Sequence, residues 1–414
     1  MNYFIKKIHV NKLFHLENFD IPIANASYPH LIITGKNGSG KTILLNAIAN
    51  KLNRIKDNIS LGFLNLASNV DLWKKKLTTE TSEKDIAHAK MMLQEAQKAY
   101  DDFFEKLDIT FINYDLIDKY SKGDFVIAYY KADRHVIMIE PNAPQKPIIQ
   151  TKNNIDESTA EHFITFLVDL KFQELLAISK NQKEDKERIT NWFVNFENML
   201  KEIYQDDDLS LHFSDEEKKY SFKIVTKNKE FGFNEMADGF KAAINIVADL
   251  ILKMQSDGII SDAYKKEGIV LIDEIETHLH LELQRIIMPF MTRTFPNIQF
   301  IVTTHSPFVL SSMPNAVAYD LEHKKPIENL TNYSYESLAE GYFGVRAESS
   351  DVRHRLNRVK ELLEKEELSV SEIDTLKKYI NDFDNIPEAV SPSLIGEYLK
   401  LKLKYVNKIK ELMQ

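Results

Sequence analysis

A glycine-rich stretch near the N-terminus constrains the fold of this chain more than any other feature. It fits the pattern G-x-x-x-x-G-K-[ST] at every position and reads Gly35-Lys36-Asn37-Gly38-Ser39-Gly40-Lys41-Thr42. The apolar run Leu31–Ile33 before it indicates a buried strand, and Ile43–Ala49 after it indicates a buried helix. A strand, a glycine-rich loop and a helix in this order predict a phosphate-binding loop within an α/β fold.

The residue types in this loop suit a bound nucleoside triphosphate. Glycine lets the backbone curl so that successive N–H groups face the phosphates, and the following helix adds a favourable dipole. Lys41, a candidate catalytic residue, is expected to bridge the β- and γ-phosphates, and the Thr42 hydroxyl is expected to ligate Mg²⁺. The alternative is a purely structural turn, which the flanking strand and helix disfavour. All of residues 35–42 are therefore candidate nucleotide-binding residues.

Two later apolar runs also indicate strands that lead into polar residues. Gly268–Ile272 precedes Asp273 and Glu274, and Gln299–Thr303 ends shortly before His305. Ligands of open α/β sheets bind at the carboxyl ends of the strands. Asp273 is expected to hold the hydration shell of Mg²⁺, and Glu274 to orient and deprotonate the attacking water. His305 is a candidate γ-phosphate sensor that also positions the water, the alternative being a loop histidine with an ordinary structural partner.

Composition and charge place the chain among soluble globular proteins. Of 414 residues, 43% are apolar and 28% are charged, and 53 Lys and Arg against 62 Asp and Glu give a net charge of −9. The absence of cysteine excludes disulfides, thiolate nucleophiles and cysteine-ligated zinc, and fits a reducing cytoplasm. No apolar run approaches the ~18–20 residues of a membrane span, and the N-terminus lacks a signal-peptide pattern. We expect a cytoplasmic protein without a membrane partner, in which nucleic acid binds only at a local basic stripe.

The middle of the chain alternates between predicted strands and helices. Apolar residues from Ile86 to Leu107 recur at steps of three and four, which predicts a long helix over 82–107. This helix either packs on its own domain or forms a short protruding arm that meets a partner. Further elements are expected as follows: strands over 109–114, 125–130 and 136–139, two helices within 158–204, a hairpin over 209–233, a buried helix over 236–255, and an amphipathic helix from about 280 to 295.

The C-terminal part is predicted to be helical and highly charged from about residue 346. Ser369 and Glu372 have the spacing of a capping box, and Ser391-Pro392 can open a further helix. The domains are therefore expected as follows: a large domain over 1–330, with a helical insert at about 80–107 and a helical subdomain at about 155–205, and a helical region over 331–414.

As a set, these motifs resemble those of the ABC-type ATPases, in the branch of RecF, the OLD proteins and the structural-maintenance-of-chromosomes proteins. The resemblance covers residues 1–310 and rests on the stretches 35–42, 235–240, 273–280 and 304–307. It implies an α/β fold in which a mixed sheet core carries an antiparallel β subdomain and a helical subdomain, followed by a small helical tail. It also implies Mg-dependent ATP hydrolysis, with ATP and Mg²⁺ as cofactors and with the metal held at Thr42 and Asp273.

The stretch Glu235–Phe240 occupies the place of the family's signature motif. The resemblance implies that Asp238 and Gly239, at the start of a helix, cap the γ-phosphate of ATP bound to the opposite subunit of a head-to-head homodimer or higher oligomer. Ala237 stands where the family usually has serine, so one hydroxyl donor is missing and slow turnover is expected. The family's Mg-contacting glutamine has no counterpart between residues 109 and 134.

Two further groups of residues each leave an alternative open. Glu276, His278 and His280 form either a metal site or a loop across the dimer interface, and the lack of a further ligand at a known spacing favours the loop. Lys74–Lys76 either contact phosphates or form a solvated face.

Several defence-associated bacterial ATPases, those of Septu-type and PARIS antiphage systems, resemble this chain in their compact head and small helical tail. In that group the ATPase acts with a separate effector. Residues after 310 show no nuclease pattern, so the region 331–414 is expected to dock a partner or build an oligomer. The resemblance implies an ATP-hydrolysing switch subunit of an antiphage complex with an effector such as a nuclease. Two alternatives remain, a RecF-like or chromosome-type ATPase that clamps duplex DNA and an ATP-holding scaffold with negligible turnover.

Overall fold

The computed structural model describes residues 4–23, 29–56, 60–79, 81–112, 115–147, 154–215, 219–255, 263–327, 330, 335, 337–338, 341, 350–386 and 392–413. The chain divides into two compact units, Met1–Tyr333 and Ser334–Gln414. Within these described residues, no helix combines the length and the apolar character that crossing a membrane requires.

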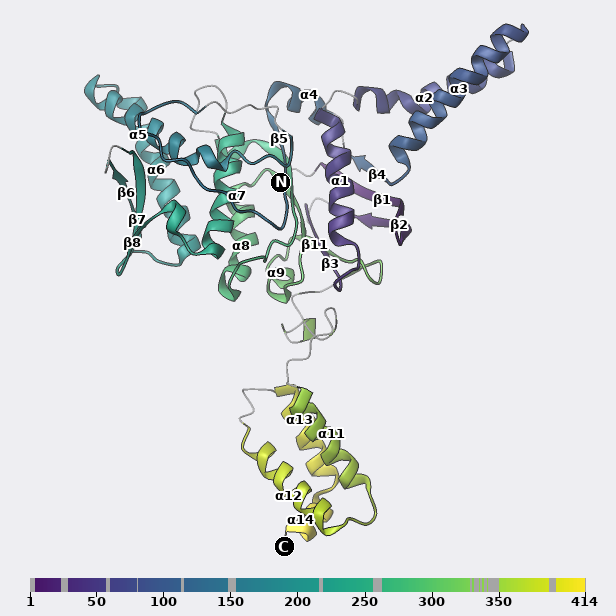
Figure 1. Cartoon of the computed structure of the whole chain (residues 1–414), viewed down its shortest axis with the longest axis vertical. Coiled ribbons are helices and arrows are strands. Elements are labelled where there is room, and N and C mark those ends of the chain that lie inside the picture. Colours follow the sequence, from purple (N-terminus) through teal and green to yellow (C-terminus); the bar gives the residue numbers. More distant parts are fainter. Residues whose placement is uncertain are drawn as a thin grey trace. The chain divides into compact units, whose positions relative to one another are not determined.

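A six-stranded sheet forms the centre of the first unit (Figure 1). All neighbouring strands are parallel except for one antiparallel pair at an edge. In spatial order the strands are β12 (Lys325–Ile327), β11 (Ala316–Asp320), β3 (His30–Thr34), β10 (Ile298–Thr303), β9 (Glu267–Ile272) and β5 (Phe125–Tyr130). β3 and β10 are buried at every residue, as parallel strands covered on both faces should be. The carboxyl ends of β3, β10 and β9 therefore lie side by side at one edge of the sheet.

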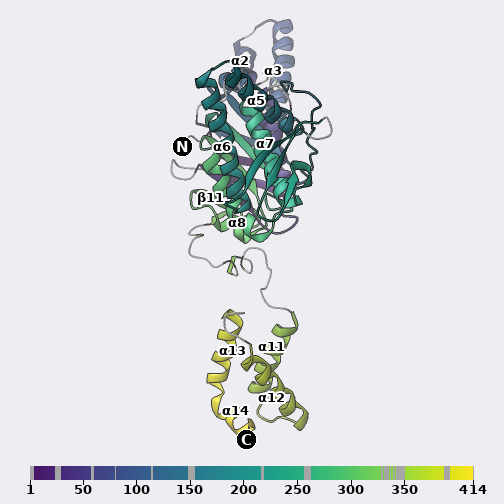
Figure 2. The same ribbon diagram turned by 90° about the vertical axis from the view of Figure 1, so that its left-hand side faces the viewer.

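Helices cover both faces of this sheet. α1 (Lys41–Lys56) contributes apolar side chains to the core on one face. α7 (Asp238–Met254) and α8 (Leu281–Thr294) lie on the opposite face, which is turned toward the viewer in Figure 2. Three shorter helices complete this region: α4 (Asp115–Lys122), α9 (Pro307–Ser311) and the 3-10 helix η4 (Ala263–Lys265). This arrangement confirms the predicted α/β class.

A three-stranded antiparallel sheet packs on the outer side of α1. Its strands are β2 (Leu16–Pro22), β1 (Ile5–Leu13) and β4 (Leu107–Phe111). One apolar core contains buried residues of this sheet, of α1 and of the central sheet. Gln299 of β10 adds a polar link, because its Oε1 accepts the N–H groups of Phe4 and Ile5 at 2.9 and 2.8 Å. The layer matches the antiparallel β subdomain that the resemblance implied.

A helical hairpin leads away from these sheets in Figure 1. Its helices are α2 (Ser60–Thr79) and α3 (Glu83–Phe104), which pack against each other. Ala89 of the apolar seam on α3 is fully buried in this contact region. The long helix predicted over 82–107 is present as α3, although it ends at Phe104 and Leu107 belongs to β4. It packs on α2 of the same chain, and the contact with a partner stays a prediction. The helix α2 itself was not predicted.

The chain between β5 and α7 forms a helical subdomain. The 3-10 helix η1 (Ala160–His162), α5 (Phe163–Ser179) and α6 (Lys183–Tyr204) come first. Trp192 of α6 packs its ring against Phe166 of α5 and Phe196 of α6, each with centroids 5.4 Å apart. An antiparallel sheet and a short 3-10 helix follow: β6 (Ser210–Ser214), β7 (Ser221–Val225), β8 (Glu230–Gly232) and η3 (Phe233–Glu235). The hairpin expected over 209–233 thus has a third strand.

The strand expected over residues 136–139 is wrong. The N–H of Met138 donates to Asn234 Oδ1 at 2.9 Å, and Asn234 Nδ2 donates to the carbonyl of Met138 at 2.9 Å. The N–H of Ile139 donates to the carbonyl of Glu161 at 2.8 Å. Because these backbone groups already have partners, the segment does not join a sheet.

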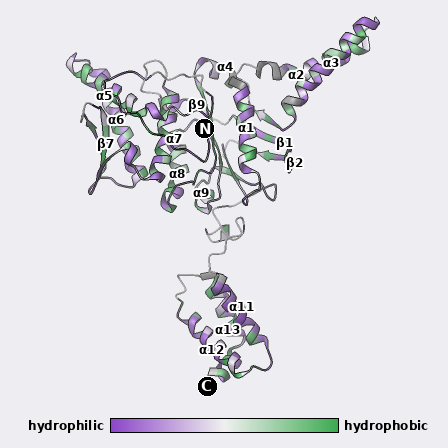
Figure 3. Cartoon of the chain, viewed as in Figure 1, coloured by the Kyte–Doolittle hydropathy of each residue, from purple (hydrophilic) through white to green (hydrophobic). Residues whose placement is uncertain are grey.

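The second unit is a small helical bundle with its own apolar core. Its helices are α11 (Ser350–Glu364), α12 (Val370–Asp384), α13 (Pro392–Lys404) and α14 (Val406–Met413). Hydrophobic and hydrophilic residues mix along each helix (Figure 3), as amphipathic helices require. The predicted capping box is present at α12, where the Glu372 carboxylate accepts the Ser369 N–H at 3.1 Å. α13 begins at Pro392 as expected, whereas Ser391 lies outside the described residues.

Candidate functional site

Three of the predicted motifs meet where β3, β10 and β9 end. The parallel register places Ile301 of β10 beside Leu31 of β3 and Leu271 of β9, so the three strands end together. The Thr34 hydroxyl donates to the carbonyl of Thr304 at 3.1 Å, which ties the start of the glycine-rich loop to the end of β10. Residues 35–42, Asp273, Glu274 and His305 therefore come from neighbouring strand ends.

The glycine-rich loop has the backbone that only glycine adopts easily. Gly38 and Gly40 have φ of 82° and 97°, in the region where a side chain is strained. Lys41 is only 5% exposed. Its ammonium group donates to the carbonyls of Gly35 and Lys36 at 2.9 and 3.1 Å. Burial lowers the pKa of Lys41, while the nearby carboxylates of Glu274, Glu276 and Asp273 oppose the shift.

The two carboxylates after β9 are held in different ways. Asp273 is 2% exposed, and its Oδ1 accepts a hydrogen bond of 2.5 Å from the hydroxyl of Thr303. Glu274 is partly exposed and has a positive φ of 45°, which is uncommon for a residue with a side chain. Its N–H donates to the same Thr303 oxygen at 2.8 Å. Thr303 thus orients both acidic residues, a role that sequence analysis missed.

His305 is anchored through its backbone and keeps a neutral ring. The N–H of His305 donates to the carboxylate of Glu276, and the hydroxyl of Thr304 donates to the other oxygen of Glu276 at 2.7 Å. Burial, and next the charge of Lys41, lower the pKa of His305 to about 4. Burial raises the pKa of Glu276, and these two hydrogen bonds oppose that shift. At neutral pH the His305 ring can therefore donate one hydrogen bond and accept another.

The predicted signature segment forms the N-terminus of α7. Ala237 is the N-cap residue and has the extended ψ of 145°, but it offers no side chain to cap the first turn. Ala237 and Asp238 are exposed. A Cβ on Gly239 would lie 2.7 Å from the carbonyl oxygen of His278, so only glycine permits this close packing on residues 274–280. Among the described residues, no hydrogen bond joins Asp238 or Gly239 to the glycine-rich loop of the same chain.

The residues present fit a magnesium nucleotide. The hydroxyl of Ser39 is buried without a partner among the described residues, so the loop has an unmet polar group. Thr42 is exposed and supplies a hydroxyl, and Asp273 supplies a carboxylate. Mg²⁺ accepts oxygen ligands of both types. A separate metal site at Glu276, His278 and His280 has no support, since the described part of the chain contains no cluster of three His, Asp or Glu side chains arranged for a metal.

Arg134 is a second residue that sequence analysis missed. It lies four residues after β5, in the region where the family's glutamine was sought, and it is 8% exposed. Its guanidinium contacts the carbonyl oxygens of Asp273 and Glu274. The sequence did contain one signal for this role, an arginine just after an apolar strand. Arginine is rarely buried without a partner, so such a position indicates a specific contact.

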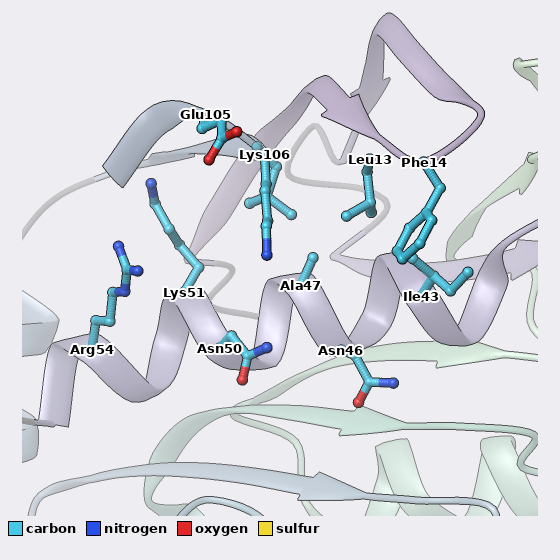
Figure 4. A pocket seen from close by; sticks show the side chains of 11 residues that line it. Leu13, Phe14, Ile43, Asn46, Ala47, Asn50, Lys51, Arg54, Glu105 and Lys106 are labelled. Carbon is cyan, nitrogen blue, oxygen red and sulfur yellow. The ribbon is translucent and has the colours of Figure 1, made fainter. Parts of the chain in front are cut away.

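A cavity of about 720 Å³ lies between α1 and the antiparallel sheet (Figure 4). Lys51 and Arg54 of α1 and Lys106 before β4 line it, with Glu105 as the one acidic lining residue. Burial lowers the pKa of Lys51 to about 7, and its ammonium group lies 4.6 Å from the centre of the Phe104 ring. The cavity is therefore a basic hollow near the base of the α2–α3 hairpin.

The fold and the meeting of the three strand ends make this chain similar to the head of an ABC-type ATPase. A family model described as "ABC transporter" matches residues 26–127, which contain the glycine-rich loop. A second, described as "AAA domain, putative AbiEii toxin, Type IV TA system", matches residues 140–311, which contain the other motifs.

Among characterised proteins, this chain is similar to the Septu protein PtuA and to retron ATPases. It is 35% identical over 111 residues to Septu protein PtuA of Bacillus thuringiensis, which is 25% of this chain and 28% of that protein. It is 36% identical over 91 residues to the retron Vc95 probable ATPase of Vibrio cholerae, which is 22% of this chain and 18% of that protein. It is 42% identical over 88 residues to the retron Ec83 probable ATPase of Escherichia coli, which is 21% of this chain and 16% of that protein. The matched stretches thus span less than a third of each relative.

One solved structure, an Smc head bound to the C-terminal winged-helix domain of ScpA, is 13% identical with a TM-score of 0.36. The matched part covers 77% of this chain and 95% of the Smc head chain.

Proposed function

We propose that this chain is the ATP-hydrolysing switch subunit of an antiphage defence complex and works with a separate effector such as a nuclease. The observation that carries the proposal is the meeting of the glycine-rich loop, the Asp273-Glu274 pair and His305 at adjacent ends of parallel strands. Similarity to proteins named Septu PtuA and retron probable ATPase supports the defence setting. The second unit would dock the effector or build an oligomer.

In this proposal the chain's own residues divide the chemistry between them. The loop N–H groups and Lys41 hold the phosphates, and Thr42 and Asp273 hold Mg²⁺. When bound, Mg²⁺ supplies charge neutralisation at the phosphate oxygens. Glu274 accepts the proton of the attacking water, while neutral His305 donates a hydrogen bond to the γ-phosphate.

A second copy of the chain would complete the site. The first turn of α7 has exposed residues and no side-chain cap, so its N–H groups are available to a phosphate. If those groups bind the γ-phosphate held by a partner's glycine-rich loop, ATP joins two heads and hydrolysis separates them. The packing of Gly239 on His278 would fix the direction of this helix end.

Light scattering in the presence of ATP and Mg²⁺ tests the dimer. Glu274→Gln should bind ATP without hydrolysing it and should shift to twice the monomer mass, whereas Lys41→Ala should keep the mass of the nucleotide-free protein. An unchanged mass for Glu274→Gln with and without ATP rejects the dimer. Single-turnover hydrolysis tests the enzyme: His305→Ala should retain ATP binding and lose turnover. No turnover in the wild type would instead favour a scaffold, which the missing hydroxyl at Ala237 also favours.

A DNA-clamping ATPase is the second candidate, and the basic cavity favours it. Arg54 and Lys106 lie near the base of the α2–α3 hairpin, where a duplex would find cationic groups. This candidate predicts duplex binding that weakens steeply with salt and strengthens with ATP. Lys106→Glu should then lower duplex affinity without changing ATP affinity.

A further inference from the structure

Arg134 is a buried charge at the junction of three parts of the head. It follows β5, faces the loop after β9 and lies under α7. Burial lowers the pKa of Arg134 to about 10, while Glu276, Asp273 and Glu274 oppose the shift, so the group is charged at neutral pH. A buried charge of this kind needs specific partners to be tolerated.

The partners of the guanidinium are backbone carbonyls of the two acidic residues. Nη2 donates to the carbonyl of Glu274 at 2.9 Å, and Nη1 lies 3.4 Å from the carbonyl of Asp273. Glu274 has a φ of 45°, a conformation that is unfavourable for a residue with a side chain. The charge-assisted contacts from Arg134 offset that cost and hold the backbone of Glu274 in this conformation.

The same segment is fastened to α7. Asn245 of α7 donates through Nδ2 to the carbonyl of Arg134 at 3.1 Å. Asp249, one turn further along α7, accepts the hydroxyl of Tyr130 at 2.6 Å, and the carbonyl of Tyr130 accepts the N–H of Asp273 at 2.8 Å. A cavity of about 350 Å³ borders Arg134 and Asn245, so the segment has room to shift. A continuous set of hydrogen bonds therefore runs from α7 to Glu274.

We propose that Arg134 is a positioning residue that holds the backbone of Glu274 and couples it to the position of α7. The expected effect on ATP hydrolysis rests on the proposed ATPase function. The expected effect on the Glu274 backbone rests on the hydrogen bonds alone. A guanidinium has donors only and cannot ligate a cation, so this residue acts differently from a metal-contacting glutamine. A movement of α7 when its N-terminus meets a phosphate would reach Glu274 through Asn245 and Arg134.

The conservative variant Arg134→Lys separates positioning from mere charge, because lysine keeps the charge but loses the two-pronged geometry. We expect single-turnover hydrolysis to fall about 100-fold, as for a misplaced catalytic group. The Kd for ATP should change less than about 3-fold, since the guanidinium of Arg134 contacts backbone carbonyls and lies outside the glycine-rich loop. Asn245→Ala, which removes the hydrogen bond to the carbonyl of Arg134, should also lower the rate of single-turnover hydrolysis. The matched control is Lys131→Ala in the same segment, an exposed lysine paired with Asp156, which should retain the wild-type rate.

Hydrogen exchange of the nucleotide-free, full-length protein gives a readout that is independent of catalysis. The amides of residues 273–277 should exchange about tenfold faster in Arg134→Lys than in the wild type, because their loop opens locally. Unchanged exchange in this segment overturns the proposal, as does hydrolysis within twofold of the wild type or an equal loss of ATP binding and turnover. If the wild type itself never hydrolyses ATP, the proposed function fails, and the exchange rates alone still decide the role of Arg134.

Discussion

At the scale of single residues, buried polar side chains carry much of the specificity of this head. Gln299 is fully buried and uses both ends of its amide. Its Oε1 accepts two backbone N–H groups of the N-terminal strand region, and its Nε2 donates to the carbonyls of Ile5 and Pro29 at 3.0 and 2.9 Å. One side chain thus satisfies four backbone groups and joins the central sheet to the chain around β1.

Gln299→Leu should destabilise the head strongly. Leucine fills a similar volume but leaves four buried backbone groups without a partner, so the free energy of unfolding should fall by at least about 3 kcal/mol. Urea denaturation followed by circular dichroism measures the change. Asn297→Ala, which removes an exposed amide from the same strand region, should cost less than about 1 kcal/mol. Equal losses for the two variants would contradict the importance assigned to Gln299.

His30 gives a prediction about pH. It is 3% exposed on β3, its Nδ1 accepts the N–H of Phe300 at 3.1 Å, and burial lowers its pKa to about 4. The unfolded chain, with a histidine pKa near 6.5, binds the proton more readily than the folded one. The stabilisation is therefore fully present above pH 6.5 and is lost as the pH falls toward 4, by about 2 kcal/mol between pH 7 and pH 5.

The variant His30→Asn isolates this effect, because asparagine keeps an acceptor at the same branch and does not titrate. Urea denaturation at pH 7 and pH 5 should show a loss of unfolding free energy about 2 kcal/mol smaller in the variant than in the wild type. Identical pH dependence of the two proteins would show that His30 is not the group responsible.

At the scale of elements, contiguous patterns were predictable and distant contacts were not. Three strands were each visible as a short apolar run with a polar end: the strand before the glycine-rich loop, the strand before Asp273 and the strand before His305. The structure brings these ends together. The false strand over 136–139 was equally apolar, but its backbone is satisfied by Asn234, nearly a hundred residues later. Thr303 and Arg134 were missed for the same reason, since only the folded sheet brings them to the acidic pair.

The N-terminus of α7 allows a test of the missing hydroxyl. Ala237→Ser should cap the first turn, which raises the unfolding free energy by about 1 kcal/mol. If the serine hydroxyl also reaches the γ-phosphate in the dimer, single-turnover hydrolysis should rise about tenfold, the equivalent of one charge-assisted hydrogen bond. Ala237→Gly, which adds no hydroxyl, should leave the rate unchanged. A serine variant that hydrolyses ATP at the wild-type rate would mean that this position does not contact the phosphate.

At the scale of the whole molecule, the chain consists of two units with separate cores. The core of the second unit consists of side chains from its own helices, among them Leu356, Val359, Leu362, Phe383 and Tyr398. Tyr398 also donates from its hydroxyl to Asp384 at 2.7 Å, so a buried polar group of this bundle finds its partner inside the bundle. Domains of roughly this size often fold alone when their core is complete.

We therefore expect each unit to work without the other. A fragment of residues 334–414 should be helical and should unfold cooperatively on heating, whereas Phe383→Ala in that fragment should abolish the transition, because a lost buried phenyl ring costs about 3–5 kcal/mol. A fragment of residues 1–333 should bind ATP within about threefold of the full chain, since the loop and the acidic pair belong to the head. Circular dichroism and nucleotide titration measure the two outcomes. A head fragment that loses ATP binding while remaining folded would show that the second unit contributes to the nucleotide site, and the division of labour proposed between the units would be wrong.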